Sequence, residues 1–139
     1  MESISIRQLM VAEDQLEQIR DAISKLQQWN ASIKSADDYT LSPDGMKTLA
    51  ATCMLIEAIG EGVKKIDNLT QQKMLEQRPE IPWRQIKDMR NHIAHGYFDI
   101  NTDFVWDVVQ NDLQPLLEAI EYFIKNIYSI VPFEKEMIE

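Results

Sequence analysis

Residues 3–29, SISIRQLMVAEDQLEQIRDAISKLQQW, carry the pattern that decides the fold class. Apolar side chains recur there at steps of three and four residues: Ile6, Leu9, Leu16, Ile19, Ile23 and Leu26. Polar residues fill the gaps, and neither Gly nor Pro interrupts the segment. This spacing forms one apolar stripe on a helix, so the segment predicts a long amphipathic helix.

The middle of the chain predicts a polar loop and a second long helix. Residues 32–45 are polar and rich in turn formers, which is typical of a loop with a short helical turn. Ser42 as N-cap and Pro43 as the first helical residue predict a helix that runs to about residue 66. Gly60 and Gly62 lower the stability of that helix relative to Ala. They either let another helix approach closely or are simply tolerated.

The second half of the chain predicts further helices and no strand. The expected segments are a short helix over 68–76, a break at RPEIP (78–82), a helix over 83–95 ended by Gly96, and helix over 103–129 that Pro115 restarts or kinks. No run of alternating β-branched residues predicts a strand. We therefore expect one all-α domain over 1–139, with residues 132–139 as a tail that can fray. Its architecture is an up-down bundle of about four main helices plus short helices, with room for a dimer face.

Composition narrows the class of protein. The chain has 139 residues, one Cys and two His, with 14 Lys+Arg against 23 Asp+Glu and a net charge of -9. The lone Cys53, expected to be a buried small hydrophobe, excludes a disulfide framework and a Cys-based zinc site. No metal or cofactor is predicted. Neither an apolar run of ~20 residues nor a signal peptide is present, so we expect a soluble cytoplasmic protein without membrane contact.

Positive charge is concentrated in one quarter of the sequence. Residues 64–95 hold seven basic and four acidic residues, a net of +3, whereas the remainder holds seven basic and nineteen acidic residues, a net of −12. The acidic balance argues against broad binding to a phosphate backbone, which Lys and Arg drive. A local basic site remains open.

Residues 90–97, RNHIAHGY, combine a fixed cation, a group that titrates near neutral pH and a phenol. Arg90 can bind a phosphate through two hydrogen bonds, and His95 can donate or accept a proton near pH 7. Together they suit metal-independent cleavage of RNA, with Asn91 orienting either group. On a regular helix Arg90 and His95 lie about 140° apart. They need a distorted helix end near Gly96, a shared cleft, or a second copy of the segment.

The same residues have a structural interpretation. Cations such as Arg90, His92 and His95 are favoured near a helix C-terminus by its dipole. Tyr97 could be a partly buried core aromatic with a wet hydroxyl. From the residues alone this interpretation is favoured, because the spacing by itself is a weak signal.

The motif Arg90-x4-His95-x-Tyr97 resembles that of the HepT toxins, a branch of the HEPN superfamily. Three longer blocks are also similar to that family: 56–66, 78–100 and 105–121. With the N-terminal helix, the resemblance covers nearly the whole chain. It implies a helical bundle that dimerises, with the motifs of two subunits flanking one cleft.

The resemblance also implies an activity and a partner. The activity is that of a type VII toxin-antitoxin toxin, a metal-independent endoribonuclease that cleaves cellular RNA. The implied catalytic pair is Arg90 and His95, with Asn91 as the polar residue that follows the Arg. The implied partner is a cognate minimal nucleotidyltransferase, an antitoxin that transfers AMP to Tyr97. Adenylylation would place bulk and negative charge beside the cleft.

Other residues keep two interpretations each. His92, at a spacer position, either contacts a substrate phosphate or is a plain surface residue. Arg84 and Lys87 either guide RNA toward the cleft or are ordinary surface charges. Glu61 and Lys65 are four residues apart, in the orientation that favours an ion pair. Finally, the tryptophans are expected to pack rather than stack on bases: Trp29, Trp83 and Trp106.

An alternative function stays open. The chain could be a non-catalytic HEPN nucleotide- or partner-binding module that docks a nucleotidyltransferase, because one fold can host enzymes and binding modules. A purely structural helical dimer would leave the coincidence of Arg90, His95 and Tyr97 unexplained.

Overall fold

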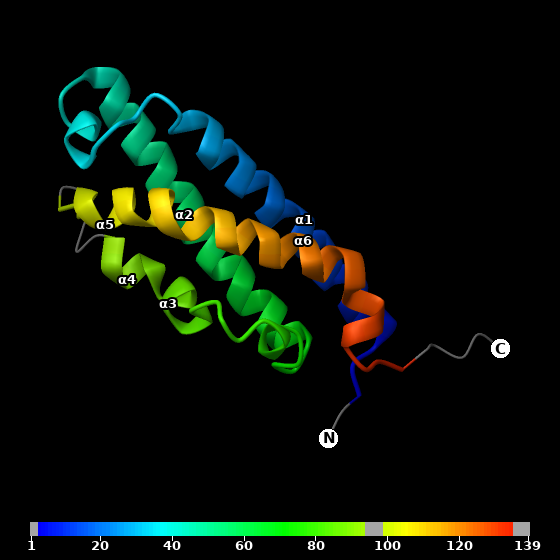
Figure 1. Ribbon diagram of the computed structural model, residues 1–139. Coiled ribbons are helices and arrows are strands. Elements are labelled where there is room, and N and C mark those ends of the chain that lie inside the picture. The colour runs from blue at the N-terminus through cyan, green and yellow to red at the C-terminus, as the bar shows by residue number, and fades with distance from the viewer. Residues whose placement is uncertain (1–2, 94–98, 135–139) are drawn as a thin grey trace.

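The computed structural model describes residues 3–93 and 99–134, which are mostly helical (Figure 1). In chain order the elements are α1 (Ile6–Trp29), η1 (Ala36–Tyr39), α2 (Pro43–Leu69), η2 (Leu75–Gln77), α3 (Trp83–Lys87), α4 (Met89–Ile93), α5 (Thr102–Asp107), η3 (Val108–Asp112) and α6 (Leu113–Ile130). η1 and η2 are 3-10 helices, and η3 is a π-helix. No strand occurs in the described residues, where an isolated bridge joins Ser5 to Glu134. The all-α fold class is confirmed.

The two longest helices begin at caps that their sequences encode. Ser5 forms a capping box with Gln8: its hydroxyl accepts from the Gln8 amide at 3.1 Å, and the Gln8 side chain accepts from the Ser5 amide at 2.8 Å. The Ser42 hydroxyl accepts from the Gly45 amide at 2.9 Å, with Pro43 first in α2, as predicted. Each such cap satisfies amides that a helix start leaves without partners.

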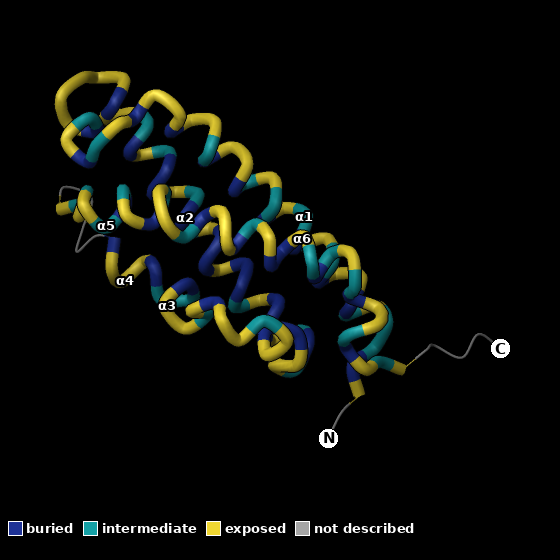
Figure 2. Tube along the Cα trace, in the orientation of Figure 1, coloured by how far each residue is buried: buried dark blue, intermediate teal, exposed yellow. Residues whose placement is uncertain are grey.

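The core lies where α1, α2 and α6 pack together. Buried and exposed residues alternate at helical spacing along these elements (Figure 2). The predicted stripe of α1 is buried from Leu9 to Leu26, and Phe123 of α6 joins the same cluster. Cys53 is buried as expected, and burial, followed by the charge of Glu57, raises the pKa of its thiol to about 11. Among the described helices, none is both long and apolar enough to cross a membrane.

Gly60 and Gly62 sit at close contacts of α2. A Cβ built on Gly60 would lie 2.8 Å from the Ile86 carbonyl oxygen, so the backbone of α3 occupies that space. A Cβ on Gly62 would lie 2.9 Å from Nε2 of Gln15 and 3.0 Å from Cδ1 of Ile19, both on α1. Of the two sequence interpretations, close approach is therefore correct at both positions.

The short helix predicted over 68–76 is wrong. α2 continues to Leu69, and a turn follows in which Gln71 and Gln72 have φ values of 52° and 65°. The Gln72 amide donates to the Asp67 carbonyl at 2.9 Å, so the turn satisfies a helix-end carbonyl. Regular structure resumes only in η2, which is three residues long.

The last predicted helix is divided. α5 leads directly into the π-helix η3, and α6 starts at Leu113, two residues before Pro115. Pro115 has no amide to donate to a carbonyl four residues earlier, and its ring crowds that carbonyl. A widened π turn at this point relieves both conflicts. The prediction that Pro115 starts a new helix or kinks the old one is confirmed.

The expectation that all three tryptophans pack is wrong for Trp29, which is 42% exposed. Trp29 lies one position off the buried stripe, which explains its exposure. Trp106 packs edge-on against the ring of Tyr39, with centroids 6.3 Å apart.

Asn30 takes the buried position at the end of α1 instead of Trp29. Its Nδ2 donates to the Thr52 hydroxyl at 3.0 Å, and its Oδ1 accepts from the Tyr39 hydroxyl at 2.6 Å.

Candidate functional site

The first residues of the RNHIAHGY segment lie in the short helix α4, where three of them are exposed. Met89 and Ile93 are 4% and 0% exposed, and residues four apart share a helix face. Because that face is buried, Arg90, Asn91 and His92 point away from the core, and all three are exposed. The sequence therefore presents a cation, an amide and an imidazole on consecutive residues of one helix.

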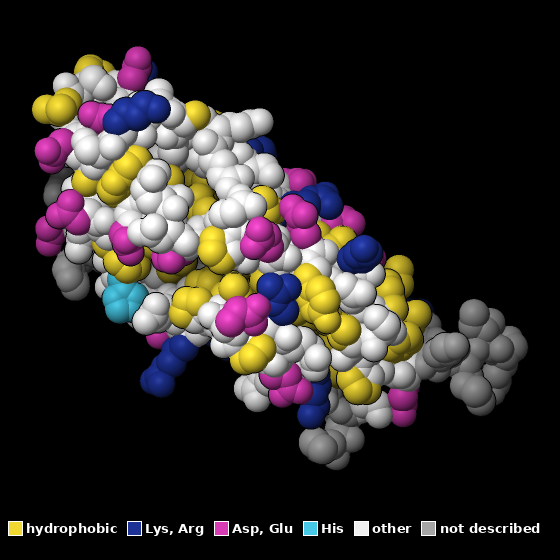
Figure 3. Space-filling view, viewed as in Figure 1, with side chains coloured by type: hydrophobic (Ala, Val, Ile, Leu, Met, Phe, Trp, Pro, Cys, Tyr) yellow, Lys and Arg dark blue, Asp and Glu magenta, His cyan; other side chains and the backbone are white. Residues whose placement is uncertain are grey.

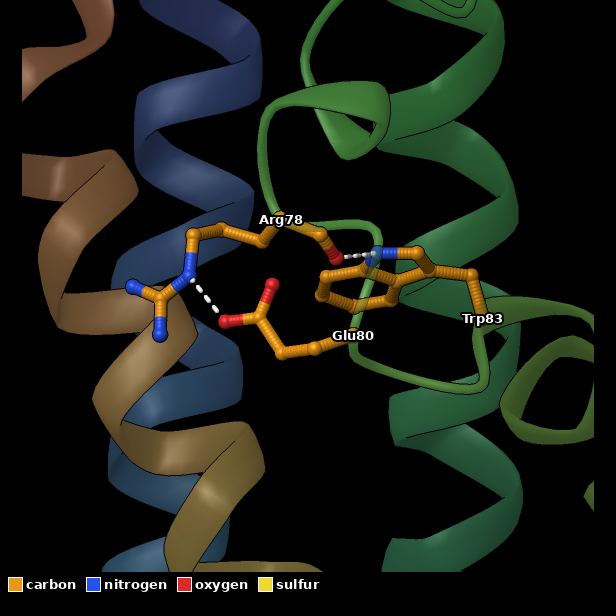
Figure 4. A network of polar contacts seen from close by, with 3 residues as sticks. All are labelled: Arg78, Glu80 and Trp83. Carbon is orange, nitrogen blue, oxygen red and sulfur yellow. Dashed lines mark hydrogen bonds and ion pairs between the residues drawn. The ribbon is translucent and has the colours of Figure 1, made fainter.

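The loop before α3 is fastened by the network of polar contacts in Figure 4. The Arg78 guanidinium donates from Nε to the Glu80 carboxylate at 2.7 Å, and the Trp83 indole donates to the Arg78 carbonyl at 2.9 Å. The same guanidinium lies over the ring of Tyr122, 5.1 Å from its centroid, and Trp83 stacks on Phe123 at 5.8 Å. These contacts attach the start of α3 to α6.

The predicted continuous helix over 83–95 is wrong, because it breaks at Asp88. The Asp88 amide is shared between the carbonyls of Arg84 and Gln85, each at 3.2 Å, and its φ and ψ are −100° and 13°. Asp has low intrinsic helix propensity, which makes it a suitable residue for this break. The break lets α4 take its own direction.

Some cations of the basic segment 64–95 are held in ion pairs, and others are not. The Lys87 ammonium forms an ion pair with Asp67, a buried residue of α2. Arg78 pairs with Glu80. Within the part of the chain that the structure describes, no carboxylate pairs with Arg84 or Arg90, and both are exposed. These are the two guanidinium groups of the basic segment that are available to an anionic ligand. The ammonium groups of Lys65 and Lys73 are also exposed and form no ion pair in the described chain.

Glu61 pairs with Lys64 at 3.2 Å, three residues away, rather than with the predicted Lys65. The Lys64 and Glu61 side chains are 43% and 63% exposed, so the solvated face that the sequence favours is correct. An open hollow of about 460 Å³ lies here, between the start of α1 and the end of α2, lined by Gln8, Glu61, Lys64, Lys65, Asn68 and Leu69. Exposed pairs of this kind contribute little to stability.

His92 lies against an aromatic ring. Its imidazole centroid is 5.6 Å from that of Phe104 on α5, with the ring planes 34° apart. The histidine side chain is visible at the surface in Figure 3, in cyan, with hydrophobic atoms beside it. The sequence offered His92 only as a phosphate contact or a plain surface residue, and this contact with Phe104 was missed.

Two of the predicted site residues, His95 and Tyr97, lie outside the described residues, as does the predicted helix end at Gly96. The structure therefore shows Arg90, Asn91 and His92 as consecutive exposed residues of α4 and gives no geometry between Arg90 and His95. Over residues 3–93 and 99–134, no three His, Cys, Asp or Glu side chains are grouped closely enough to hold a metal ion.

The fold and this site define an all-α protein that exposes the consecutive residues Arg90, Asn91 and His92 on a short helix. The chain belongs to the HepT-like family, described as ribonuclease HepT-like, whose family model matches residues 13–123. The match runs from the first half of α1 into α6. It therefore includes α4 and the helices α2 and α5, which both contact it.

Two relatives illustrate the likeness. The chain is 32% identical over 108 residues to a Thermococcus cleftensis protein named "Probable ribonuclease HepT", covering 78% of this chain and 91% of that protein. It is 33% identical over 81 residues to "Putative RNase MJ0127" of Methanocaldococcus jannaschii, covering 58% of this chain and 64% of that protein. Comparison with solved structures gives no match. These names support the ribonuclease class that the sequence predicts.

Proposed function

We propose that the protein is a metal-independent endoribonuclease that cleaves cellular RNA in the cytoplasm. The observation that carries the proposal is the exposed Arg90 guanidinium, which has no carboxylate partner among the described residues. An unpaired guanidinium can bind a phosphate through two parallel hydrogen bonds. Membership of the ribonuclease HepT-like family supports the same assignment.

The proposed reaction needs one cation and one proton carrier. His95 takes the proton of the RNA 2′-hydroxyl, whose oxygen then attacks the adjacent phosphorus. The bond from phosphorus to the 5′ oxygen breaks, and that oxygen receives a proton from an imidazolium. Arg90 stabilises the negative charge that develops on the phosphate oxygens, and Asn91 orients either group.

The proposed active unit is a homodimer, in which the segments of two subunits flank one cleft. A dimer lets Arg90 of one subunit act with His95 of the other, which removes the 140° separation expected on one regular helix. We propose Arg84 as a further RNA contact, because its guanidinium is exposed and without an ion pair in the described chain. Lys87, bound to Asp67, is better suited to hold α3 against α2.

The proposed biological role is that of a type VII toxin. A cognate minimal nucleotidyltransferase neutralises it by adenylylating Tyr97. A phosphodiester added there carries negative charge, which would repel RNA and compete for Arg90. The alternative is a non-catalytic module that docks the same nucleotidyltransferase.

Purified protein of verified intact mass, incubated with total RNA in EDTA, tests the activity. We expect cleavage by the unmodified protein and none by Arg90→Ala. Arg20→Ala is the matched control, since Arg20 is a cation of α1 that pairs with Asp21. Cleavage that is equal in Arg90→Ala and wild type would overturn the assignment of Arg90.

Co-expression with a minimal nucleotidyltransferase tests the toxin role. We expect a gain of AMP mass that inhibits cleavage, and its loss in Tyr97→Phe. Stable binding of the two proteins without RNA cleavage by the unmodified dimer would favour the docking-module alternative.

A further inference from the structure

Two hydrogen bonds of Asn101 connect the end of α4 with the start of α5. Its backbone amide donates to the carbonyl of Ile93 at 2.7 Å. Its side-chain Oδ1 accepts from the Phe104 amide at 3.0 Å and so caps α5. Ile93 is fully buried, which makes it a firm attachment point.

The ring contact between His92 and Phe104 connects the same two elements. The centroid distance of 5.6 Å and the angle of 34° describe a tilted ring contact. His92 is the residue before Ile93, which accepts the Asn101 backbone bond, and Phe104 is the residue whose amide Asn101 caps. The ring contact and the hydrogen bonds therefore act on the same junction. We call this junction the clasp and define it as His92, Ile93, Asn101 and Phe104.

We propose that the clasp is a positioning device for the ribonuclease site and that His92 is a positioning residue in it. The inference rests on the proposed function for its kinetic part only. The clasp fixes α4, which carries Arg90 and Asn91, against the start of α5. Holding a short helix in this way removes part of its conformational freedom. Reactive groups held close to their productive geometry react faster than loosely held ones.

This role differs from both interpretations that the sequence left open for His92. A residue that contacts a substrate phosphate acts through its charge and its N–H groups. A plain surface residue has no effect at all. A clasp residue acts through the flat ring that it lays against Phe104, so another aromatic ring should replace it.

Amide hydrogen exchange at Asn101 tests the clasp without any RNA. We expect His92→Ala to speed that exchange by about two- to tenfold, the range that the loss of one aromatic pair allows. His92→Phe should restore the wild-type rate. Phe104→Leu, which keeps an apolar side chain at a partly buried position, should resemble His92→Ala. An Asn101 exchange rate unchanged in both variants would overturn the clasp.

Tyr128→Ala is the matched control. Tyr128, near the C-terminal end of α6, forms a ring pair with Phe133, with 5.9 Å between the centroids. Figure 1 shows that this end of α6 lies at the opposite end of the molecule from α5. Loss of that pair should leave the Asn101 amide unaffected.

Steady-state RNA cleavage tests the consequence for the reaction. We expect His92→Ala to lower kcat by about two- to tenfold with KM unchanged, and His92→Phe to restore kcat. A raised KM in His92→Ala would indicate direct RNA contact and overturn the positioning role. Failure of His92→Phe to restore kcat would indicate proton transfer by His92 and would also overturn the positioning role. If the wild type cleaves no RNA, the proposed function fails, whereas the exchange measurement still decides the clasp.

Discussion

The two halves of α2 contact regions of opposite character. In its first half, Thr52 joins Asn30 and Tyr39 in a buried hydrogen-bonded cluster that connects α1, η1 and α2. In its second half, α2 supports α3, which leads into α4 with its exposed Arg90 and His92. No buried side-chain nitrogen or oxygen of the described residues lacks a hydrogen-bond partner. The first region uses its polar groups to satisfy one another, whereas the second presents them to solvent. Stability and activity should therefore respond to different substitutions.

The largest effect is expected at Arg90. Loss of one group that stabilises transition-state charge typically costs about 10²–10³ in kcat. An exposed side chain contributes little to folding, so Arg90→Ala should change the free energy of unfolding by less than about 0.5 kcal/mol. RNA cleavage assays and urea unfolding of the same samples check both parts. Equal losses of activity and stability would mean that the two regions are not separable.

The opposite result is expected at Tyr39. Tyr39→Phe leaves the Asn30 Oδ1 atom without its donor, and an unsatisfied buried acceptor costs about 1–3 kcal/mol. Cleavage measured well below the melting temperature should be unchanged. Asn30→Asp with Tyr39 retained serves as a second probe of the same cluster, since it buries a charge. A stability of Tyr39→Phe equal to wild type would show that the hydrogen bond is not needed.

Alkaline pH sharpens the same test. Burial, followed by the charge of Cys53, raises the pKa of Tyr39 to about 12 from an ordinary value of 10.0. Above pH 10 the unfolded chain loses the proton while the folded chain keeps it, so stability falls as pH rises from about 10 to 12. Tyr39→Phe should show a shallower fall over that window in pH-dependent unfolding. Parallel curves for the two proteins would contradict the buried neutral phenol.

A smaller effect is expected at Gly60, where the two regions are coupled through α2. The Cβ of Gly60→Ala meets a backbone oxygen of α3, and overpacking of this kind costs about 1–3 kcal/mol, offset by about 1 kcal/mol of helix propensity. Because α3 leads into α4, activity should fall as well.

Gly62→Ala is the matched control for Gly60→Ala. Its Cβ meets side-chain atoms of Gln15 and Ile19 rather than a backbone oxygen, so stability should fall less than in Gly60→Ala. Thermal unfolding and cleavage of both variants check the pair. Equal behaviour of the two would show that the backbone contact with α3 is unimportant.

The smallest effect is expected at Arg84. Arg84→Ala should raise KM by about two- to fivefold and lower the slope of log K against log salt by about 0.7, as for one phosphate contact on a single strand. A salt titration of RNA binding measures the slope. Lys87→Gln should change the slope less, because its ammonium pairs with Asp67. An unchanged slope in Arg84→Ala would exclude the contact.

The sequence predicts the long helices well and the short ones poorly. The stripe of α1 and the Ser42-Pro43 start of α2 are local signals, and both are confirmed. The break at Asp88 depends on how α3 packs against Gly60, which no local pattern contains. Of the site, the exposure of Arg90 follows from the burial of its neighbours Met89 and Ile93. The ring contact of His92 joins residues that are twelve positions apart in the sequence, so spacing alone could not predict it.

The π turn of η3 determines how α5 is rotated about the helix axis relative to α6. Removing one residue between 108 and 112 would make the segment from α5 to α6 a regular helix and rotate α5 by about 100° relative to α6. Phe104 would then turn away from His92, and Trp106 away from Tyr39. The widened turn therefore sets the rotation of the packed face of α5 relative to that of α6. The face of α6 meets α1, and that of α5 meets α4 and η1.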